Sequence, residues 1–274
     1  MRLQEKLAEC RTNKAALLAT NFYNFETLLG ILKAAKNKRL PIILQLSESS
    51  IQYLTAEVAV AMARTALKET GVEGWIHLDH GSSLEMVKRC LDAGFDSVMI
   101  DASEKPFAEN VRISKEAVKI AESYRANVEA ELGYVAKLGQ QQQGSYTQPA
   151  EAAQFVEATG VHALAIAIGS AHGFYKEPPK LQLELLSQIH NATPAALVLH
   201  GSSGIPDDQL VQAISRGICK INLATETKNI FMKTLQRVLK DTDEIDLRKV
   251  FPVATASVTS LIENKLSVIA PQVC

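Results

Sequence analysis

The sequence lacks several features that would indicate a membrane or secreted protein. No apolar stretch approaches the roughly 18 residues that a membrane-spanning helix needs, and the opening residues, MRLQEKLAEC, are charged and lack the apolar core of a signal peptide. Its cysteines share no short spacing such as C-x-x-C, which excludes a zinc knuckle and a disulfide framework: Cys10, Cys90, Cys219 and Cys274. These absences predict reduced thiols and a cytoplasmic location.

Neither sign of charge is in excess. The 29 basic and 30 acidic residues give a formal net charge of −1, and the lysines and arginines are spread along the chain. Nucleic acid and anionic membranes attract proteins through clustered positive charge. We therefore expect no nucleic-acid partner and no membrane partner, but a small molecule.

What the sequence does contain is an alternation of short apolar runs with amphipathic segments of helical length. The eight runs lie at residues 16–22, 40–47, 74–80, 97–103, 127–133, 162–169, 195–201 and 219–225. The clearest helical segments between them are residues 84–94, 109–124, 149–160 and 206–217, and a further helix is predicted in the tail at 247–266. Strands buried on both faces with helical crossovers form either a closed barrel or a long doubly wound sheet.

The barrel is the better prediction. A nucleotide-binding doubly wound sheet would show a glycine fingerprint after its first strand, and ATNFYNFET has none. The chain length of 274 residues suits one barrel, typically about 250 residues, as well as two small domains. Because no linker or shift in composition divides the chain, we predict an α/β fold: a single (β/α)8 TIM barrel over residues 1–274 with a C-terminal helical extension.

Three histidines stand where predicted strands end. His80 ends the third strand, His172 follows the sixth and His200 ends the seventh. The carboxyl ends of barrel strands face one central cleft, and three imidazoles with an open fourth position are typical of a catalytic Zn²⁺ site. The sequence therefore predicts a metal site at this end of the barrel.

A histidine taken alone is more often a hydrogen-bonded core or surface residue than a ligand. We interpret His77, His162 and His190 in that way. His77 lies three positions before His80, so alternation along an extended strand places the two side chains on opposite faces.

Two loops rich in small and hydroxyl residues follow the seventh and eighth predicted strands. They contain Gly201, Ser202, Ser203, Asn222 and Thr225, and each leads into a helix. Such loops bind phosphate in many barrel enzymes. Taken alone they would be ordinary helix caps, but beside a metal site phosphate binding is favoured.

Taken together, these motifs resemble a known family. The strings HLDHGSS, SVMIDAS, VEAELG, AIGSAHGFY, LVLHGSSGIP and KINLATE are similar, in the same order and over nearly the whole chain, to the metal-dependent class II ketose-bisphosphate aldolases. That group includes fructose-bisphosphate and tagatose-bisphosphate aldolases, and its fold is a (β/α)8 barrel.

The resemblance implies a reaction and its residues. His80, His172 and His200 would bind one Zn²⁺ per chain, and Asp79 would exchange a proton with the C4 hydroxyl of the substrate. Retro-aldol cleavage of a ketose phosphate, and the reverse condensation, would give dihydroxyacetone phosphate and an aldehyde. Zinc would stabilise the enediolate as a Lewis acid.

The resemblance also assigns supporting residues. Asp101 and Glu131 correspond to acidic residues near the metal, and we expect them to orient its ligands rather than to coordinate it. Asn21 matches an active-site asparagine. The family's phosphate site on the dihydroxyacetone half matches Gly173, Gly201, Ser203, Asn222 and Thr225. A monovalent cation near that site and a homo-oligomer, dimer or tetramer, are also expected.

Three departures from the family pattern leave the substrate open. No carboxylate occurs between Glu131 and Glu151, where the family carries a proton-transferring acid. Ala224 follows the tagatose-bisphosphate pattern rather than the fructose-bisphosphate one, and Thr255 stands where a basic residue meets the distal phosphate. One alternative is an aldolase for a ketose 1-phosphate whose C6 group is a sulfonate, a carboxylate or a hydroxyl. Another is a noncatalytic sugar-phosphate-binding subunit, against which the complete aspartate and histidine set argues.

Overall fold

Eight parallel strands close into a barrel in chain order. The structure is a computed structural model that describes residues 1–133, 146–175, 177, 179–240 and 242–269. The strands are β1 (Leu17–Asn21), β2 (Ile42–Ser47), β3 (Gly74–Gly81), β4 (Ser97–Ile100), β5 (Asn127–Leu132), β6 (Ala163–Ile166), β7 (Ala196–Leu199) and β8 (Ile218–Leu223). Pairing of β8 with β1, with Leu17 opposite Lys220, closes the barrel. The predicted TIM barrel and its C-terminal helix are confirmed, since each apolar run contains one strand or all but one residue of it.

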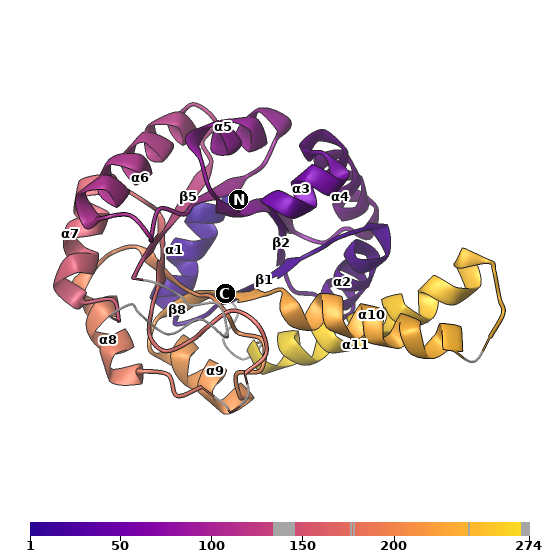
Figure 1. Cartoon of the computed structure of the whole chain (residues 1–274). Helices are drawn as coiled ribbons and strands as arrows, with labels where there is room; N and C mark the ends of the chain where they lie inside the picture. The colour runs from indigo at the N-terminus through magenta and orange to yellow at the C-terminus, as the bar shows by residue number, and fades with distance from the viewer. Residues whose placement is uncertain (134–145, 176, 178, 241, 270–274) are drawn as a thin grey trace.

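Helices surround the barrel and connect its strands (Figure 1). They are α2 (Phe25–Lys38), α3 (Glu48–Leu54), α4 (Ala56–Thr70), α5 (Leu84–Ala93), α6 (Phe107–Glu122), α7 (Pro149–Thr159), α8 (Leu183–Ala192) and α9 (Asp207–Ser215). The local sequence sets their ends, as α5 shows: the Ser83 hydroxyl accepts a hydrogen bond from Met86 N, and Gly94 takes the left-handed conformation that ends the helix.

Two further helices form an arm. Helices α10 (Thr225–Lys240) and α11 (Leu247–Ile269) pack against each other, and α11 also packs along α2. Figure 1 shows both helices projecting beyond the ring of the other helices. None of the helices in the described part of the chain is both long and apolar enough to span a bilayer.

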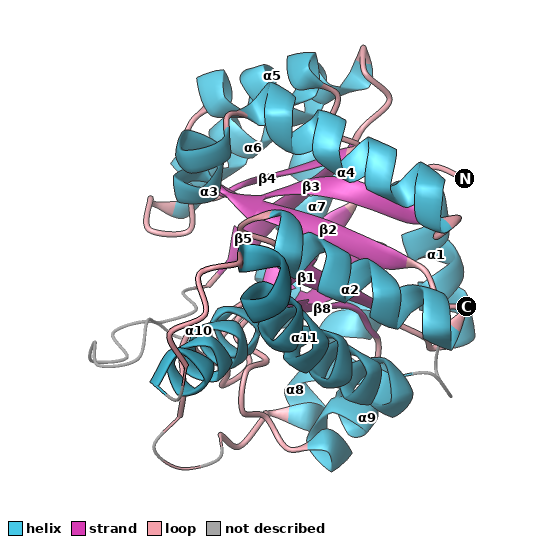
Figure 2. Cartoon of the chain, turned by 90° about the vertical axis from the view of Figure 1, so that its right-hand side faces the viewer, coloured by secondary structure: helices cyan, strands magenta, loops and turns pink. Residues whose placement is uncertain are grey.

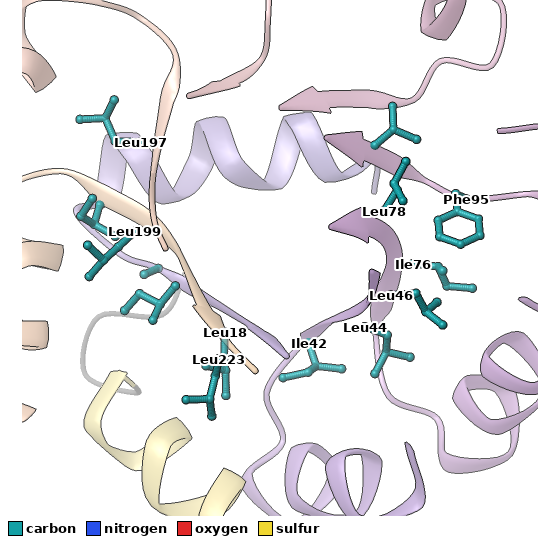
Figure 3. Packing of buried hydrophobic residues seen from close by; sticks show 14 of the residues in the cluster. Leu18, Ile42, Leu44, Leu46, Ile76, Leu78, Phe95, Leu197, Leu199 and Leu223 are labelled. Carbon is teal, nitrogen blue, oxygen red and sulfur yellow. The ribbon is translucent and has the colours of Figure 1, made fainter. Parts of the chain in front are cut away.

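The core has two layers. The outer layer lies between the strands and the surrounding helices, and Figure 3 shows its side chains, such as Leu44, Ile76 and Leu199, pointing away from the barrel axis. The inner layer fills one end of the barrel, where Leu3 and Leu7 of α1 (Leu3–Asn13) pack with the inward side chains of Leu17, Ile43 and Trp75. Helix α1 lies at that end in Figure 2.

Above this apolar floor the inward positions become polar. Gln45, His77, Glu129 and Lys220 lie inside the barrel, and each is fully buried. Buried polar groups are costly unless they are paired. This layer of buried polar side chains therefore lies between the apolar end of the barrel and its carboxyl end, where the predicted site lies.

Candidate metal centre and active site

The three predicted histidines converge. One ring nitrogen from each of His80, His172 and His200 lies within 4.8 Å of the other two. The ring centroids are 5.0 Å apart for His80 and His172, 4.7 Å for His80 and His200, and 5.7 Å for His172 and His200. These side chains come from β3 and from the residues that follow β6 and β7, as the sequence predicted.

His80 reaches this cluster through an unusual backbone conformation. Its φ of 54° is left-handed, and the pairing register of β3 and β4 shifts between Leu78 and Gly81. The expectation that His77 and His80 point to opposite faces is therefore wrong. Both side chains face the barrel interior, where His77 Nε2 lies 3.3 Å from Lys220 Nζ and His80 Nε2 lies 3.0 Å from His200 Nδ1.

Two carboxylates determine which ring nitrogens of His80 and His200 face the centre of the cluster. Asp101 Oδ2 lies 2.7 Å from His80 Nδ1, and Glu129 Oε1 lies 2.8 Å from His200 Nε2. A neutral imidazole that donates one N–H to a carboxylate presents the other nitrogen as a ligand, an arrangement that is usual around bound metal ions. The residues present thus fit a zinc ion held by three nitrogens.

The charges around the cluster also favour a cation. Burial alone would lower the pKa of His80, but the hydrogen bond to Asp101 and the negative charges of Asp79 and Glu131 outweigh it and raise the pKa to about 9. For His200, burial, His80 and Lys220 hold the pKa well below its usual value, so this ring is neutral. A second set of potential ligand atoms joins His80 to Asp101 and Glu131. Both acids thus lie beside His80, and Asp101 contacts it directly.

Asp79 lies beside the histidines, next to the side-chain amides of Asn21 and Asn222. Asn21 Nδ2 donates a hydrogen bond to Asp79 Oδ2 at 2.9 Å, and Asn222 Nδ2 lies 3.4 Å from Oδ1. Burial alone would raise the pKa of Asp79, but the positive charge of His80 and the hydrogen bond from Asn21 hold it below its usual value. The carboxylate is therefore ionised and positioned, as a proton acceptor must be.

The side-chain amides of Asn21 and Asn222 differ in their capacity to bind a ligand. The Asn21 carbonyl accepts a hydrogen bond from Gln45 Nε2 at 3.1 Å while its amide nitrogen holds Asp79, so Asn21 acts on the carboxylate. Among the described residues, Asn222 Oδ1 is buried with no hydrogen-bond partner. Asn222 is therefore the one of the two that can accept a hydrogen bond from a ligand.

The predicted phosphate loops lie side by side at the end of β7 and β8. The Ser202 hydroxyl donates to the Asn222 carbonyl oxygen at 2.6 Å, and the Ser203 hydroxyl accepts from Glu226 N at 3.3 Å. Because Glu226 lies in the first turn of α10, the hydrogen bond that Ser203 accepts from it is a helix-capping bond, the alternative role considered for these loops. Glu226 Oε1 also accepts from Gly204 N at 2.7 Å and lies 3.5 Å from Lys265 Nζ.

Gly201 brings the loop after β7 against the loop that carries His172. Its φ is 67°, and a Cβ at this position would lie 2.3 Å from the carbonyl oxygen of Ala171. The Tyr175 hydroxyl joins the same two loops, because it donates to Gly201 O at 2.8 Å and accepts from Ala171 N at 2.6 Å. Gly201 therefore sets the position of the residue next to His172. Gly173, on the other side of His172, also has a positive φ, 111°.

We predict that Gly201→Ala lowers both the stability and the metal affinity of the protein. Gly71→Ala is the matched control, because Gly71 has a φ of 68° and nothing within 4 Å of a Cβ at this position. The control carries only the left-handed strain, about 1–2 kcal/mol. Gly201→Ala must in addition displace Ala171. Thermal unfolding and zinc titration of both variants test this, and equal losses in the two would contradict it.

Two other expectations concern residues away from the histidines. Thr255 does not line this cleft: it is 8% exposed and lines a groove between α2 and α11, and none of the predicted site residues lines that groove. The prediction that Thr255 faces the distal phosphate is thus not supported within the single chain. Most of the loop that lacks a carboxylate, residues 134–145, lies outside the described residues.

Two charged residues inside the barrel were not predicted as part of the site. Glu129 contacts His200, and Lys220 Nζ lies 2.7 Å from Glu129 Oε2. A signal was present, since each interrupts an apolar run that was predicted as a fully buried strand. Charged residues are almost never fully buried without a partner.

The comparisons with known proteins agree with the fold. The sequence model of the family "Fructose-bisphosphate aldolase class-II" matches residues 1–272. A fructose-bisphosphate aldolase of Geobacillus stearothermophilus is 39% identical over 271 residues, which cover 96% of this chain and 94% of that protein.

Two crystal structures are similar over nearly their whole length. A putative fructose-1,6-bisphosphate aldolase from Coccidioides immitis is 30% identical with a TM-score of 0.90, covering 99% of this chain and 96% of the other. The YdjI aldolase from Escherichia coli K12 is 31% identical with a TM-score of 0.86, covering 97% of this chain and 96% of the other. The chain belongs to the class II fructose-bisphosphate aldolase family.

Proposed function

We propose that the protein cleaves a ketose bisphosphate by a zinc-dependent retro-aldol reaction, with fructose 1,6-bisphosphate as the first substrate to test. The observation that carries the proposal is the convergence of His80, His172 and His200 beside an amide-held Asp79 at the carboxyl end of the barrel. The names of the relatives support the choice of substrate.

In the cleavage direction, the C4 hydroxyl of the ketose loses its proton as the C3–C4 bond breaks. Asp79 is the proposed acceptor, because Asn21 holds its carboxylate in place and its ionised form is favoured. The aldehyde product retains C4, and the electron pair of the broken bond stays with the fragment that contains C3. When bound to the three histidines, zinc would supply the Lewis acid that takes up this negative charge.

The remaining residues are proposed to hold the substrate. Asn222 Oδ1 is positioned to accept a hydrogen bond from a substrate hydroxyl, since it is buried without a partner among the described residues. Gly173, Gly201, Ser202, Ser203 and Thr225 supply backbone N–H and hydroxyl groups for one phosphate, next to the start of α10. A monovalent cation near this phosphate is part of the same proposal.

The test is a cleavage assay on purified protein with zinc. Fructose 1,6-bisphosphate, tagatose 1,6-bisphosphate and ketose 1-phosphates with other C6 groups are compared by kcat/KM, and the products are identified. We expect dihydroxyacetone phosphate from at least one bisphosphate at about 10⁴ M⁻¹s⁻¹ or more, the low end of ordinary enzyme efficiency. Stoichiometric zinc with no cleavage of any ketose phosphate would instead support a noncatalytic binding subunit.

We further propose that the protein forms a homo-oligomer through the arm. The groove between α2 and α11 has a volume of about 670 Å³ and is lined in part by Phe25, Leu29 and Leu247, which are 50%, 40% and 61% exposed. Ile245, between α10 and α11, is 92% exposed. A two-fold axis would let the apolar projection of each subunit pack in the apolar groove of the other.

We therefore predict that Leu247→Asp lowers the molecular mass measured by light scattering. The control is Val58→Asp, which changes an exposed apolar residue on α4, outside the arm. A wild-type protein of monomer mass at micromolar concentration, or an equal response of both variants, would contradict the proposed interface.

A further inference from the structure

Lys220 is a buried lysine at the centre of the barrel. It lies on β8, two residues before Asn222, and its side chain is only 1% exposed. An ammonium group in a protein interior is retained only with a counter-ion and satisfied hydrogen bonds. Its partner is the fully buried Glu129 of β5, whose Oε2 lies 2.7 Å from Nζ.

Glu129 connects this ion pair to the histidine cluster. While Oε2 binds Lys220, Oε1 lies 2.8 Å from His200 Nε2. A carboxylate only accepts hydrogen bonds, so His200 Nε2 carries the proton and Nδ1 is the nitrogen left to bind a metal ion. Nδ1 is also the nitrogen that faces His80, at 3.0 Å.

The lysine is held from its other side as well. His77 Nε2 lies 3.3 Å from Nζ, and His77 Nδ1 lies 2.7 Å from Ser97 Oγ, which also accepts from Asn127 Nδ2 at 2.9 Å. An ammonium only donates, so His77 Nε2 is the acceptor and Nδ1 donates to Ser97. Side chains of β3, β4 and β5 thus fix the position of the amine.

We propose that Lys220 is a positioning residue for the metal centre: by holding one oxygen of Glu129, it aims the other at His200 and so presents His200 Nδ1 to the metal. This inference rests on the proposed zinc-dependent function. Without the amine, Glu129 is a buried charge that has lost both its counter-ion and the contact that orients it. His200 then loses the carboxylate that orients its ring, and only Asn222 Nδ2 remains next to Nε2, at 3.1 Å.

The test compares Lys220→Met, Glu129→Gln and the double variant with Lys6→Met. Lys6 is the matched control, because it is a buried lysine on α1, at the floor of the barrel, and its Nζ bonds Glu9. Zinc affinity is measured by competition with a chromophoric chelator, and the cobalt-substituted proteins are compared by visible absorption. Circular dichroism and thermal unfolding monitor the fold.

We expect Lys220→Met to lose about tenfold to a hundredfold in zinc affinity, the usual effect of removing a partner behind a metal ligand, and to change the cobalt spectrum. Glu129→Gln should act in the same direction, and the double variant should lose little more than either single variant, because both act through His200. Lys6→Met should bind zinc like the wild type.

An altered unfolding temperature with zinc affinity within threefold of wild type would overturn the proposal, since Lys220 would then only stabilise the barrel. If Lys220→Met does not fold, the double variant decides, because it leaves no unpaired charge; wild-type zinc affinity in that protein would equally overturn the proposal. Failure of the proposed function is recognised separately, in a wild-type protein that binds no stoichiometric zinc.

Discussion

Asp79→Ala is expected to lower kcat by about 10²–10⁴-fold, the usual contribution of a positioned acid or base. The variant loses the only carboxylate that both Asn21 and Asn222 hold beside the histidines among the described residues. The metal should remain, because the histidine nitrogens and their partners Asp101 and Glu129 are unchanged. The separation of activity from metal content is thus the diagnostic result.

The measurement combines steady-state kinetics with zinc analysis on the same preparation. Asp79→Asn is the companion variant, because it keeps the volume of the side chain but removes its negative charge. We expect it to be as inactive as Asp79→Ala, since the missing property is proton acceptance. If Asp79→Ala lost zinc while the remaining loaded protein turned over normally, Asp79 would be a metal-holding residue and not the base.

The architecture could be predicted from the sequence because the patterns that mark its strands and its helix ends are local. Strands buried on both faces are continuous apolar runs, and glycine ends several helices. The observed strands are mostly shorter than the runs: β4 ends at Ile100 although the run extends to residue 103, where Asp101 bonds His80 and Ser103 bonds Asp101. The predicted strand was therefore too long at the end that carries site residues.

The position of the three histidines was predictable for the same reason, but the conformation of His80 was not. Alternation assumes that every residue of a strand is extended, and the left-handed conformation of His80 breaks it there. Gly81 permits the irregularity, because a Cβ there would lie 2.7 Å from both a Leu78 methyl group and the Met99 carbonyl oxygen. Nothing in the spacing of His77 and His80 carries this information.

Contacts between distant strands could not be predicted from the sequence either. Lys220 and Glu129 are 91 residues apart, and only barrel closure brings β8 and β5 to face each other. Thr255 shows the opposite case: its position in the family pattern indicated a substrate contact, whereas α11 packs on the outside of the barrel against α2.

The second large effect is expected from removal of the metal. Treatment with a chelator should abolish cleavage, and about one equivalent of zinc per chain should restore it, because three histidine nitrogens within 4.8 Å of one another form one site with an open position. His80→Ala should be inactive and should not recover with zinc. His162→Ala is the control, since that imidazole lies outside the cluster and accepts a hydrogen bond from Val128 N.

Stability provides a readout that does not depend on catalysis. A ligand that binds only the folded protein stabilises it by about 2.7 kcal/mol at a free concentration of 100 times its Kd. Zinc should therefore raise the unfolding temperature of the wild type and of His162→Ala, but not that of His80→Ala. Full cleavage activity in protein shown to be free of metal, or an equal zinc response in all three proteins, would rule out the histidine cluster as the catalytic metal site.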